Sequence, residues 1–307
     1  MRAVRFDRYG DVNVLEVREV EDPVPGADQA LIRVKAAAIN PGEAKIREGE
    51  LDAIYPTAFP SGEGSDLAGV IEAVGALVTD FGVGDEVIGF TNRRGSHAEL
   101  ALVGGADLVR RPVTVPWEVG GALFVAGTTA FAMARAVGVD AGDTVIVAGA
   151  TGGVGSIAAQ LAALRGATVL GVAGDRNGAW LTAHGIVHVP YGDGLSDRLQ
   201  AAAPNGRIDA LLDCHGEPYV ELGLELGVAP ERIDTIVDFA APTRRPGVQT
   251  AGNAVAANAE VMQQLVELVA AGRLEVPIAA TFPLAQVRDA YELLAADHPL
   301  GKVVLLP

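Results

Sequence analysis

Residues 143–176 constrain the fold of this chain more than any other segment. The segment begins with residues 144–148, a short apolar run rich in valine and isoleucine that predicts a buried strand. Closely spaced glycines follow directly, and apolar residues then recur at helical spacing among alanines. A second β-branched run, residues 168–173, predicts another strand. Strand, turn, helix and strand form one βαβ unit, which requires parallel strands and a right-handed crossover.

The glycine turn of this unit predicts a dinucleotide-binding site. Glycine permits tight, partly left-handed backbone, and the missing side chains let a pyrophosphate approach the helix N-terminus. Ala150 replaces one glycine of the common G-x-G-x-x-G pattern, and the alternative is a helix start that binds nothing. The residues expected to bind the cofactor here are Gly149, Ala150, Thr151, Gly152, Gly153, Val154 and Gly155.

Composition argues against several classes of function. The chain has 307 residues, of which 50% are apolar, and this suits two domains with sizeable cores. Its net charge of −16 argues against a nucleic-acid partner. Cys214 is the single cysteine, so neither an intrachain disulfide nor a multi-cysteine metal site can form. The chain shows neither a signal core nor an apolar span of about 18 residues, so we expect a cytoplasmic protein without a membrane partner.

The first third of the chain differs in pattern from the rest. Apolar and polar residues alternate in segments 3–6, 15–20 and 30–36, which is typical of half-buried antiparallel strands. From Trp117 onward, helical stretches alternate with short apolar runs, which predicts a doubly wound parallel sheet. The stretch after Trp117 is expected to form two helices joined at Gly127. The fold class is therefore α/β, with a β-rich domain preceding the parallel sheet.

Six segments, which together span nearly the whole chain, carry a family resemblance. They read AAAINPGEAKIREG (36–49), FPSGEGSDLAGVIEAVG (59–75), GVGDEVIGF (82–90), GTTAF (127–131), VAGATGGVG (147–155) and GKVVL (301–305). The chain resembles the zinc-free, quinone-oxidoreductase (zeta-crystallin-like) branch of the medium-chain dehydrogenase/reductase family. The resemblance implies a GroES-like β-domain followed by a Rossmann domain. We expect residues 1–116 and 273–307 to form the GroES-like substrate and catalytic domain, and residues 117–272 the Rossmann domain.

The resemblance also assigns an active site to the cleft between these domains. It implies that Asn40 lines the cleft and that Thr128 contacts the nicotinamide side, while an ordinary turn and a helix cap are the alternatives. Close relatives often place tyrosines after the Asn-Pro segment, but Lys45 and Leu51 stand at those positions here. We therefore expect no dedicated acid, with Tyr55 and Lys45 as further candidates and water as a sufficient proton source.

The chain lacks the zinc ligands of its metal-dependent relatives. Those relatives carry a cysteine near position 40, a Gly-His-Glu near 64 and a second cysteine before the Rossmann domain, whereas this chain has Asn40 and the sequence GEGSD at 62–66. The histidines show no ligand spacing, and His97 is expected on a strand surface. A reaction without a Lewis acid suits an activated acceptor, because a quinone or enone takes hydride at carbon and donors can stabilise the charge on its oxygen.

The end of the second strand of the βαβ unit bears on the choice between NADPH and NADH. Asp175 lies about 20 residues after the glycines, where an acidic residue usually binds the ribose hydroxyls of NAD. Alignment with the family, however, puts Gly174 at that position, and Arg176 can pair with a 2′-phosphate. Tyr191 matches a tyrosine near that phosphate, whereas a lysine of some relatives is Gly178 here. We expect NADPH, bound also by Gly174, Asp175, Arg176, Tyr191, Phe239 and Lys302.

Together these features predict an NADPH-dependent, zinc-independent reductase of quinones or α,β-unsaturated carbonyls. The alternatives are a pathway-specific enoyl reductase or dehydrogenase of a biosynthetic route, and a non-catalytic NADPH-binding redox sensor. Bulky apolar residues in segment 48–61 suit a flat or lipid-like substrate. The resemblance also implies a homodimer through edge strands, with residues 233–237 as a candidate interface. Cys214 is expected to pack as a small hydrophobe.

Overall fold

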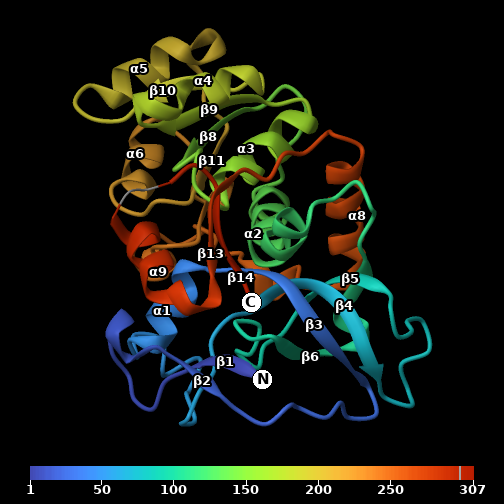
Figure 1. Ribbon diagram of the computed structural model, residues 1–307. Coiled ribbons are helices and arrows are strands. Elements are labelled where there is room, and N and C mark those ends of the chain that lie inside the picture. Colours follow the sequence, from blue (N-terminus) through green and yellow to red (C-terminus); the bar gives the residue numbers. More distant parts are fainter. Residues whose placement is uncertain (297–298) are drawn as a thin grey trace. The chain divides into compact units, whose positions relative to one another are not determined.

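The computed structural model describes residues 1–296 and 299–307 (Figure 1). The chain forms two compact units: unit 1 comprises Met1–Val125 and Asn258–Pro307, and unit 2 comprises Ala126–Ala257. Both boundaries differ from those expected, because residues 117–125 and 258–272 belong to unit 1. The second difference arises because helix α8 (Ala259–Ala270) packs on strand β7 (Leu108–Arg110) of unit 1.

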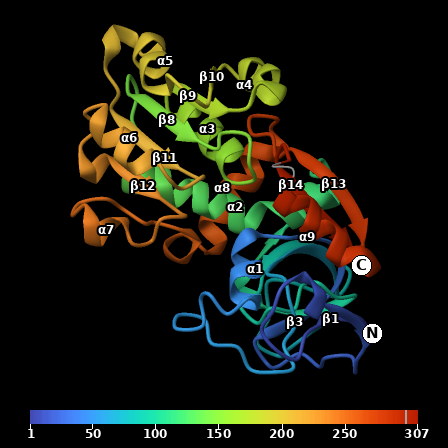
Figure 2. The same ribbon diagram turned by 90° about the vertical axis from the view of Figure 1, so that its left-hand side faces the viewer.

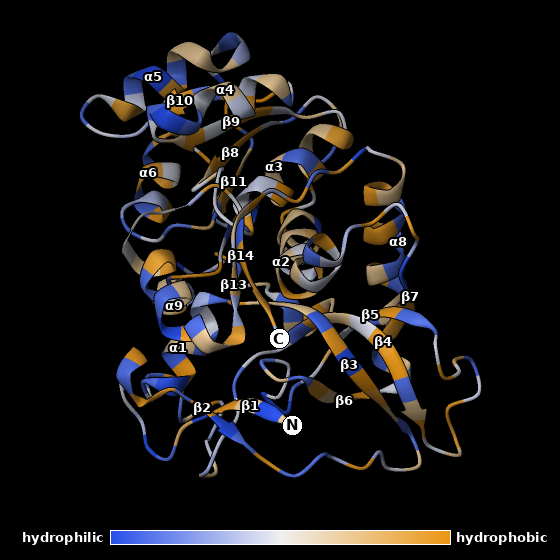
Figure 3. Cartoon of the chain, viewed as in Figure 1, coloured by the Kyte–Doolittle hydropathy of each residue, from blue (hydrophilic) through white to orange (hydrophobic). Residues whose placement is uncertain are grey.

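Unit 1 is built on a seven-stranded sheet. The strand order is β13-β14-β3-β4-β5-β7, and β6 pairs with β3. In β3, exposed Arg33 and Lys35 alternate with buried Ile32 and Val34, so the period-two pattern is confirmed (Figure 3). The other bounds are β4 (Asp66–Val74), β5 (Glu86–Phe90), β6 (Leu100–Gly104), β13 (Ile278–Pro283) and β14 (Lys302–Leu306), with β3 at Gln29–Ala38.

The C-terminal segment completes this sheet. Strand β14 pairs with β3 in the antiparallel sense and with β13 in the parallel sense. Buried residues of α9, such as Tyr291, pack against Val303 and Leu305 of β14. The remaining elements of unit 1 are β1 (Arg2–Arg5), β2 (Glu16–Glu19), α1 (Pro41–Arg47) and α9 (Val287–Ala296). The chain therefore returns to its first unit, as the resemblance implied.

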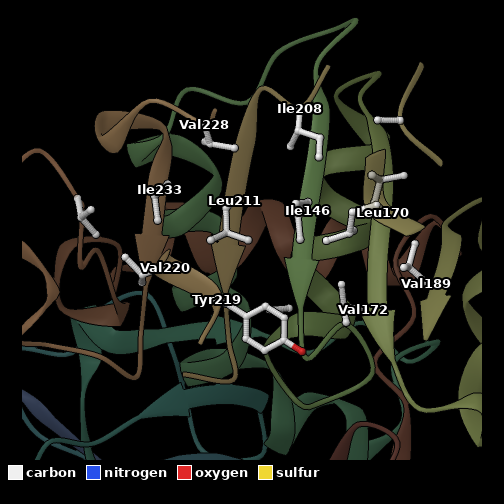
Figure 4. Close-up of a cluster of buried hydrophobic side chains, with 14 of the residues drawn as sticks. Ile146, Leu170, Val172, Val189, Ile208, Leu211, Tyr219, Val220, Val228 and Ile233 are labelled. Atoms are coloured by element: carbon white, nitrogen blue, oxygen red, sulfur yellow. The ribbon is translucent and has the colours of Figure 1, made fainter. Parts of the chain in front are cut away.

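Unit 2 is a five-stranded parallel sheet with the order β10-β9-β8-β11-β12. One face of the sheet, with Ile146, Leu170 and Leu211, packs against Val220 of a helix (Figure 4). Leu199 of a second helix belongs to the same cluster. Helix α6 packs on β11 and β12 (Figure 2). The strands are β8 (Thr144–Ala148), β9 (Thr168–Ala173), β10 (Val187–Pro190), β11 (Ala210–Asp213) and β12 (Ile233–Thr235). The helices are α3 (Gly155–Leu164), α4 (Gly178–Ala183), α5 (Leu195–Ala202), α6 (Tyr219–Glu225) and α7 (Ala241–Arg244).

The strand order of unit 2 creates a switch point between β8 and β11. From β8 the chain proceeds outward through β9 and β10, and it then returns to add β11 on the other side of β8. Ligands of doubly wound sheets bind at the carboxyl ends of the strands beside such a reversal. The glycine turn follows β8 and therefore lies at this position.

Helix α2 (Trp117–Ala136) is one continuous helix, so the expected break at Gly127 is wrong. A glycine inside a helix costs only about 1 kcal/mol, and the buried neighbours Ala126 and Ala130 offset that cost by packing. By length and composition α2 could also cross a membrane, contrary to the expectation that no such span exists. In this structure 72% of the apolar window is buried, as in core helices of soluble proteins.

The outer edge of β12 is already paired. Gln249 N donates to Ile233 O at 2.8 Å, and Thr235 N donates to Gln249 O at 3.0 Å. Gln249 thus covers part of this edge, and the interface at residues 233–237 stays a prediction.

Candidate functional site

The glycine turn after β8 depends on one residue with positive φ and on one close backbone approach. Gly149 has φ of 68°, in the left-handed region that favours glycine. A Cβ at Gly155 would lie 2.1 Å from the carbonyl oxygen of Gly149, so the first residue of α3 must also be glycine. Ala150 can replace a glycine because its methyl group faces Gly171, which has no side chain. A Cβ added at Gly171 would lie only 3.1 Å from that methyl group.

The start of α3 is open to an anion. Helix α3 has ten residues, and no side-chain hydrogen bond caps it at Val154. Gly152 tolerates a Cβ sterically, since the nearest atom would be Gly149 O at 3.4 Å. The turn therefore fits a pyrophosphate, which free N–H groups and the helix dipole attract. Among the residues expected here, Thr151 is also close to Asn177, whose Nδ2 lies 3.5 Å from Thr151 Oγ1.

At the carboxyl end of β9, the structure brings Gly174 and Tyr191 together. A Cβ at Gly174 would lie 3.3 Å from Cε1 of the Tyr191 ring, which is itself 65% exposed. A carboxylate at position 174 would therefore crowd this ring. Asp175 and Arg176 follow in an exposed 3₁₀ turn (Asp175–Asn177). Phe239 is 56% exposed in the segment after β12 of the same unit.

Unit 1 contains a buried polar cluster around Asn40. Asn40 is the N-cap of α1 and forms a capping box with Glu43, whose Oε2 accepts from Asn40 N at 2.9 Å. Asn40 Nδ2 donates to Glu43 Oε1 at 3.3 Å and to Asp66 Oδ2 at 3.1 Å. Lys302 Nζ donates to Asn40 Oδ1 and to Ile39 O. Lys302, expected to bind the cofactor, thus has two hydrogen-bond partners inside unit 1.

Asp66 links this cluster to helix α2. Its Oδ1 accepts from Val125 N at 2.7 Å, and its Oδ2 lies 3.9 Å from Lys302 Nζ. Burial raises the pKa of Asp66 to about 6, although Lys302 and Asn40 oppose the shift. Burial also lowers the pKa of Lys302, against the attraction of Asp66.

A second part of the cluster surrounds Tyr291. Tyr291 Oη donates to Glu43 Oε2 at 3.1 Å, and the Arg47 guanidinium lies 4.7 Å from the centre of its ring. Arg47 Nη1 donates to Glu63 Oε1 at 2.8 Å, and both side chains are 2% exposed. Burial is the largest cause that raises the pKa of Glu63 to about 7. The group therefore ionises near neutral pH.

His97 belongs to the same cluster, so its expected surface position is wrong. It is fully buried, Nε2 lies 3.1 Å from Ala38 O, and its ring packs near Tyr291. Burial lowers its pKa, which favours the neutral ring. The local alternation around His97 could not reveal this, because the residues that cover it come from β3 and α9.

The other predicted site residues lie outside this cluster. Thr128 is fully buried on α2. Lys45 is half-buried on α1, and Tyr55 is 44% exposed in the loop that follows. Reasoning from the sequence missed Glu43, Arg47, Glu63, Asp66 and Tyr291. Only the capping pair Asn40 and Glu43 had a local signal, namely the N-cap and N3 spacing.

Two remaining features are the side chains able to bind a metal and the Cys214 thiol. Within residues 1–296 and 299–307, no group of three or more His, Cys, Asp or Glu side chains could hold a metal ion. Cys214 Sγ lies 3.8 Å from Met133 Sδ, and burial raises the pKa of its thiol. The contact with Met133 fits the expected packing as a small hydrophobe, and the residue keeps intermediate exposure.

Comparison with known proteins defines the class. The alcohol dehydrogenase GroES-like domain matches residues 26–117, and the zinc-binding dehydrogenase model matches residues 184–305. Quinone oxidoreductase of Rattus norvegicus is 31% identical, across 100% of this chain and 98% of the relative. The structure of the Coxiella burnetii quinone oxidoreductase superposes with a TM-score of 0.88 at 27% identity, covering 100% and 99% of the two chains.

A metal-containing relative is also similar. The cobalt- and zinc-bound alcohol dehydrogenase of Pyrobaculum aerophilum has a TM-score of 0.82 at 27% identity, with coverage of 100% and 99%. All of these proteins share a GroES-like domain and a Rossmann-like parallel sheet, which is the architecture of a nicotinamide-dependent oxidoreductase. Within that class, this chain belongs to the quinone oxidoreductase branch of the medium-chain dehydrogenase/reductase family.

Proposed function

We propose that this protein is an NADPH-dependent, zinc-independent reductase that delivers hydride to a quinone or an α,β-unsaturated carbonyl compound. The observation that carries the zinc-independent part is the environment of Asn40, which stands where zinc-dependent relatives carry a cysteine. Its amide is engaged by three side chains, Glu43, Asp66 and Lys302. An amide held in this way is a poor ligand for zinc, which prefers thiolate, imidazole and carboxylate.

The preference for NADPH is supported by the carboxyl end of β9. Gly174 cannot accept hydrogen bonds from ribose hydroxyls through a side chain, and the Tyr191 ring lies against it. Arg176 is exposed on the adjacent turn, where its guanidinium can pair with a 2′-phosphate. Asp175 is exposed on the same turn and is the residue that would favour NADH.

The residues of the chain would bind and orient, and NADPH would supply the hydride when bound. The glycine turn would bind the pyrophosphate at the start of α3. Asn40 and Thr128 are the proposed orienting groups, and Phe239 is a further proposed cofactor contact. Neither Tyr55 nor Lys45 is held by the buried cluster, so water remains the proposed source of the proton that follows hydride transfer.

The test is NADPH consumption with 1,4-benzoquinone, 9,10-phenanthrenequinone, a medium-chain enone and an enoyl thioester, each with and without a chelator. We expect turnover of quinones or enones that survives chelation, and a higher kcat/KM with NADPH than with NADH. Loss of activity on chelation would refute the zinc-independent reaction. Turnover of the thioester alone would favour a dedicated enoyl reductase, and tight NADPH binding without any turnover would favour a redox sensor.

We also propose that the protein is a cytoplasmic homodimer. Its family is the basis for the dimer, and its acidic composition is compatible with the cytoplasm. Gln249 pairs with the edge of β12, so an interface at residues 233–237 would extend past this bridge or displace it. Light scattering that gives the mass of a monomer would refute the dimer, and cell fractionation tests the compartment.

A further inference from the structure

In unit 2, the loop that carries Tyr191 is held by one side chain of the first turn of α5, Arg198. Helix α5 packs on β10, the strand that leads into this loop (Figure 1). Arg198 Nε and Nη2 both donate to Pro190 O, at 3.1 and 2.8 Å. Nη1 donates to Asp193 O at 2.6 Å, and Nη2 also donates to Gly192 O at 3.2 Å. A guanidinium presents its five N–H donors in one rigid plane, so this single side chain can hold three carbonyl groups at once.

The loop contains two glycines that make its backbone adaptable. Gly192 has φ of 104° and Gly194 has φ of 75°, both in the region that favours glycine. Glycine loses more conformational entropy on ordering than any other residue, so the loop needs strong contacts to keep one conformation. The hydrogen bonds from Arg198 are charge-assisted, and they reach the carbonyl groups on both sides of Tyr191, at positions 190 and 192. They therefore fix the backbone from which the Tyr191 ring projects.

The position of this backbone decides where the Tyr191 hydroxyl lies. A Cβ added at Gly174 would meet three atoms of the ring, namely Cε1 at 3.3 Å, Oη at 3.6 Å and Cζ at 3.8 Å. The hydroxyl end of the ring thus lies beside Gly174, where an acidic side chain would begin in an NAD-binding protein. A carboxylate at that point accepts hydrogen bonds from ribose hydroxyls, whereas a tyrosine hydroxyl can donate to a phosphate. Tyr191 is 65% exposed, so a ligand can reach it.

We propose that Arg198 is a positioning residue that keeps the Tyr191 hydroxyl beside Gly174, where it donates to the 2′-phosphate of NADPH. This inference rests on the proposed function, since only NADPH carries that phosphate. All three residues belong to unit 2. The four hydrogen bonds of Arg198 go to carbonyl groups of the loop, so its effect on cofactor binding passes through Tyr191.

The first test follows the Tyr191 ring without a ligand. The chain has five tyrosines, so labelling with fluorotyrosine gives few fluorine NMR signals, and Tyr191→Phe identifies the signal of Tyr191. Arg198→Met keeps a long side chain but has no donor, and its Tyr191 signal should move toward the value in urea-denatured protein. Gln200→Met, at an exposed position of the same helix, is the matched control and should leave the signal unchanged. An unchanged Tyr191 signal in Arg198→Met would overturn the proposal.

Arg198→Lys is the second variant, and it decides the question if Arg198→Met does not fold. It retains the charge and the apolar stem, but an ammonium is a point donor and cannot span the three carbonyl groups as a planar fork does. The Tyr191 signal should move in the same direction as in Arg198→Met and by a smaller amount. A signal at the wild-type position would overturn the proposal.

Nucleotide binding provides a readout that a purely structural role would not change. The probes are adenosine 2′,5′-bisphosphate and adenosine 5′-phosphate, which differ only in the 2′-phosphate. Arg198→Met should raise the Kd of the bisphosphate about fivefold to tenfold and leave the Kd of the monophosphate within about twofold, because only the bisphosphate accepts from Tyr191. In a Tyr191→Phe background, Arg198→Met should change the ratio of the two Kd values by less than about twofold. An equal rise for both nucleotides would overturn the proposal.

The inference and the proposed function fail in different ways. If the wild-type protein binds the two nucleotides equally, the proposed preference for NADPH fails, and the contact between Tyr191 and a phosphate fails with it. The fluorine signal still decides in that case whether Arg198 holds the ring. If the wild-type protein prefers the bisphosphate and Arg198→Met retains that preference, only the role of Arg198 is refuted.

Discussion

Replacing Gly155 or Gly152 by alanine should separate the two roles of the glycine turn. At Gly155 the added Cβ would lie 2.1 Å from Gly149 O, 2.8 Å from Gly149 C and 3.1 Å from Ala150 Cα. All three are backbone atoms, so no side chain can rotate away, and the start of α3 must move by about 1 Å. At Gly152 the nearest atom would be Gly149 O at 3.4 Å, an ordinary van der Waals contact.

The expected magnitudes follow from this difference. Gly155→Ala should lower the free energy of unfolding by about 2–3 kcal/mol, the upper part of the range for overpacking, and should abolish tight NADPH binding. Gly152→Ala should change the free energy of unfolding by less than about 0.5 kcal/mol, because nothing in the protein opposes its methyl group. It should nevertheless weaken NADPH binding at least about tenfold, since that methyl would occupy the space of the pyrophosphate.

The assays are urea denaturation followed by circular dichroism and NADPH titration followed by fluorescence. Gly252→Ala is the matched control in the same unit, because a Cβ there meets nothing within 4 Å and the backbone does not have a positive φ. The control should retain both stability and binding. Unchanged stability of Gly155→Ala would refute the steric argument, and unchanged NADPH affinity of Gly152→Ala would refute the placement of the pyrophosphate.

Three further outcomes are expected. The pKa of Glu63 is raised to about 7, so the stabilisation that its protonated form confers is present below its unfolded pKa near 4.5 and is lost as the pH rises through 7. The free energy of unfolding should therefore decline less between pH 5 and pH 8 in Glu63→Gln than in wild type, and an equal decline in urea denaturation would contradict this. Arg176→Ala should raise KM for NADPH about tenfold and leave KM for NADH unchanged in steady-state kinetics with both cofactors. An unchanged KM for NADPH would show that Arg176 does not bind the 2′-phosphate. The Cys214 thiol should react with a disulfide reagent at least about tenfold more slowly in native than in urea-denatured protein, and equal rates would indicate an accessible thiol.

Most contacts in the buried cluster of unit 1 could not be predicted from the local sequence. Asn40 and Glu43 lie three residues apart, so their capping box has a sequence signature. Arg47 and Glu63 are paired across a loop, and neither residue carries a local sign that it will be buried. His97 follows a pattern that indicates a surface strand, yet Tyr291 approaches it from nearly 200 residues further along the chain.

The amino-acid sequence by itself determined that a β-rich unit precedes a parallel α/β sheet, and it also determined the βαβ unit and the glycines of its turn. These follow from hydrophobic periodicity and from steric limits on the backbone, which act between residues close in the chain. Only the tertiary structure decided that Lys302 meets Asn40, that Gln249 covers β12 and that α2 continues through Gly127. Lys302 and Asn40 are 262 residues apart in the sequence, and Gln249 belongs to the segment that folds back on β12 after it. Helix α2 continues because buried packing outweighs the low helix propensity of glycine.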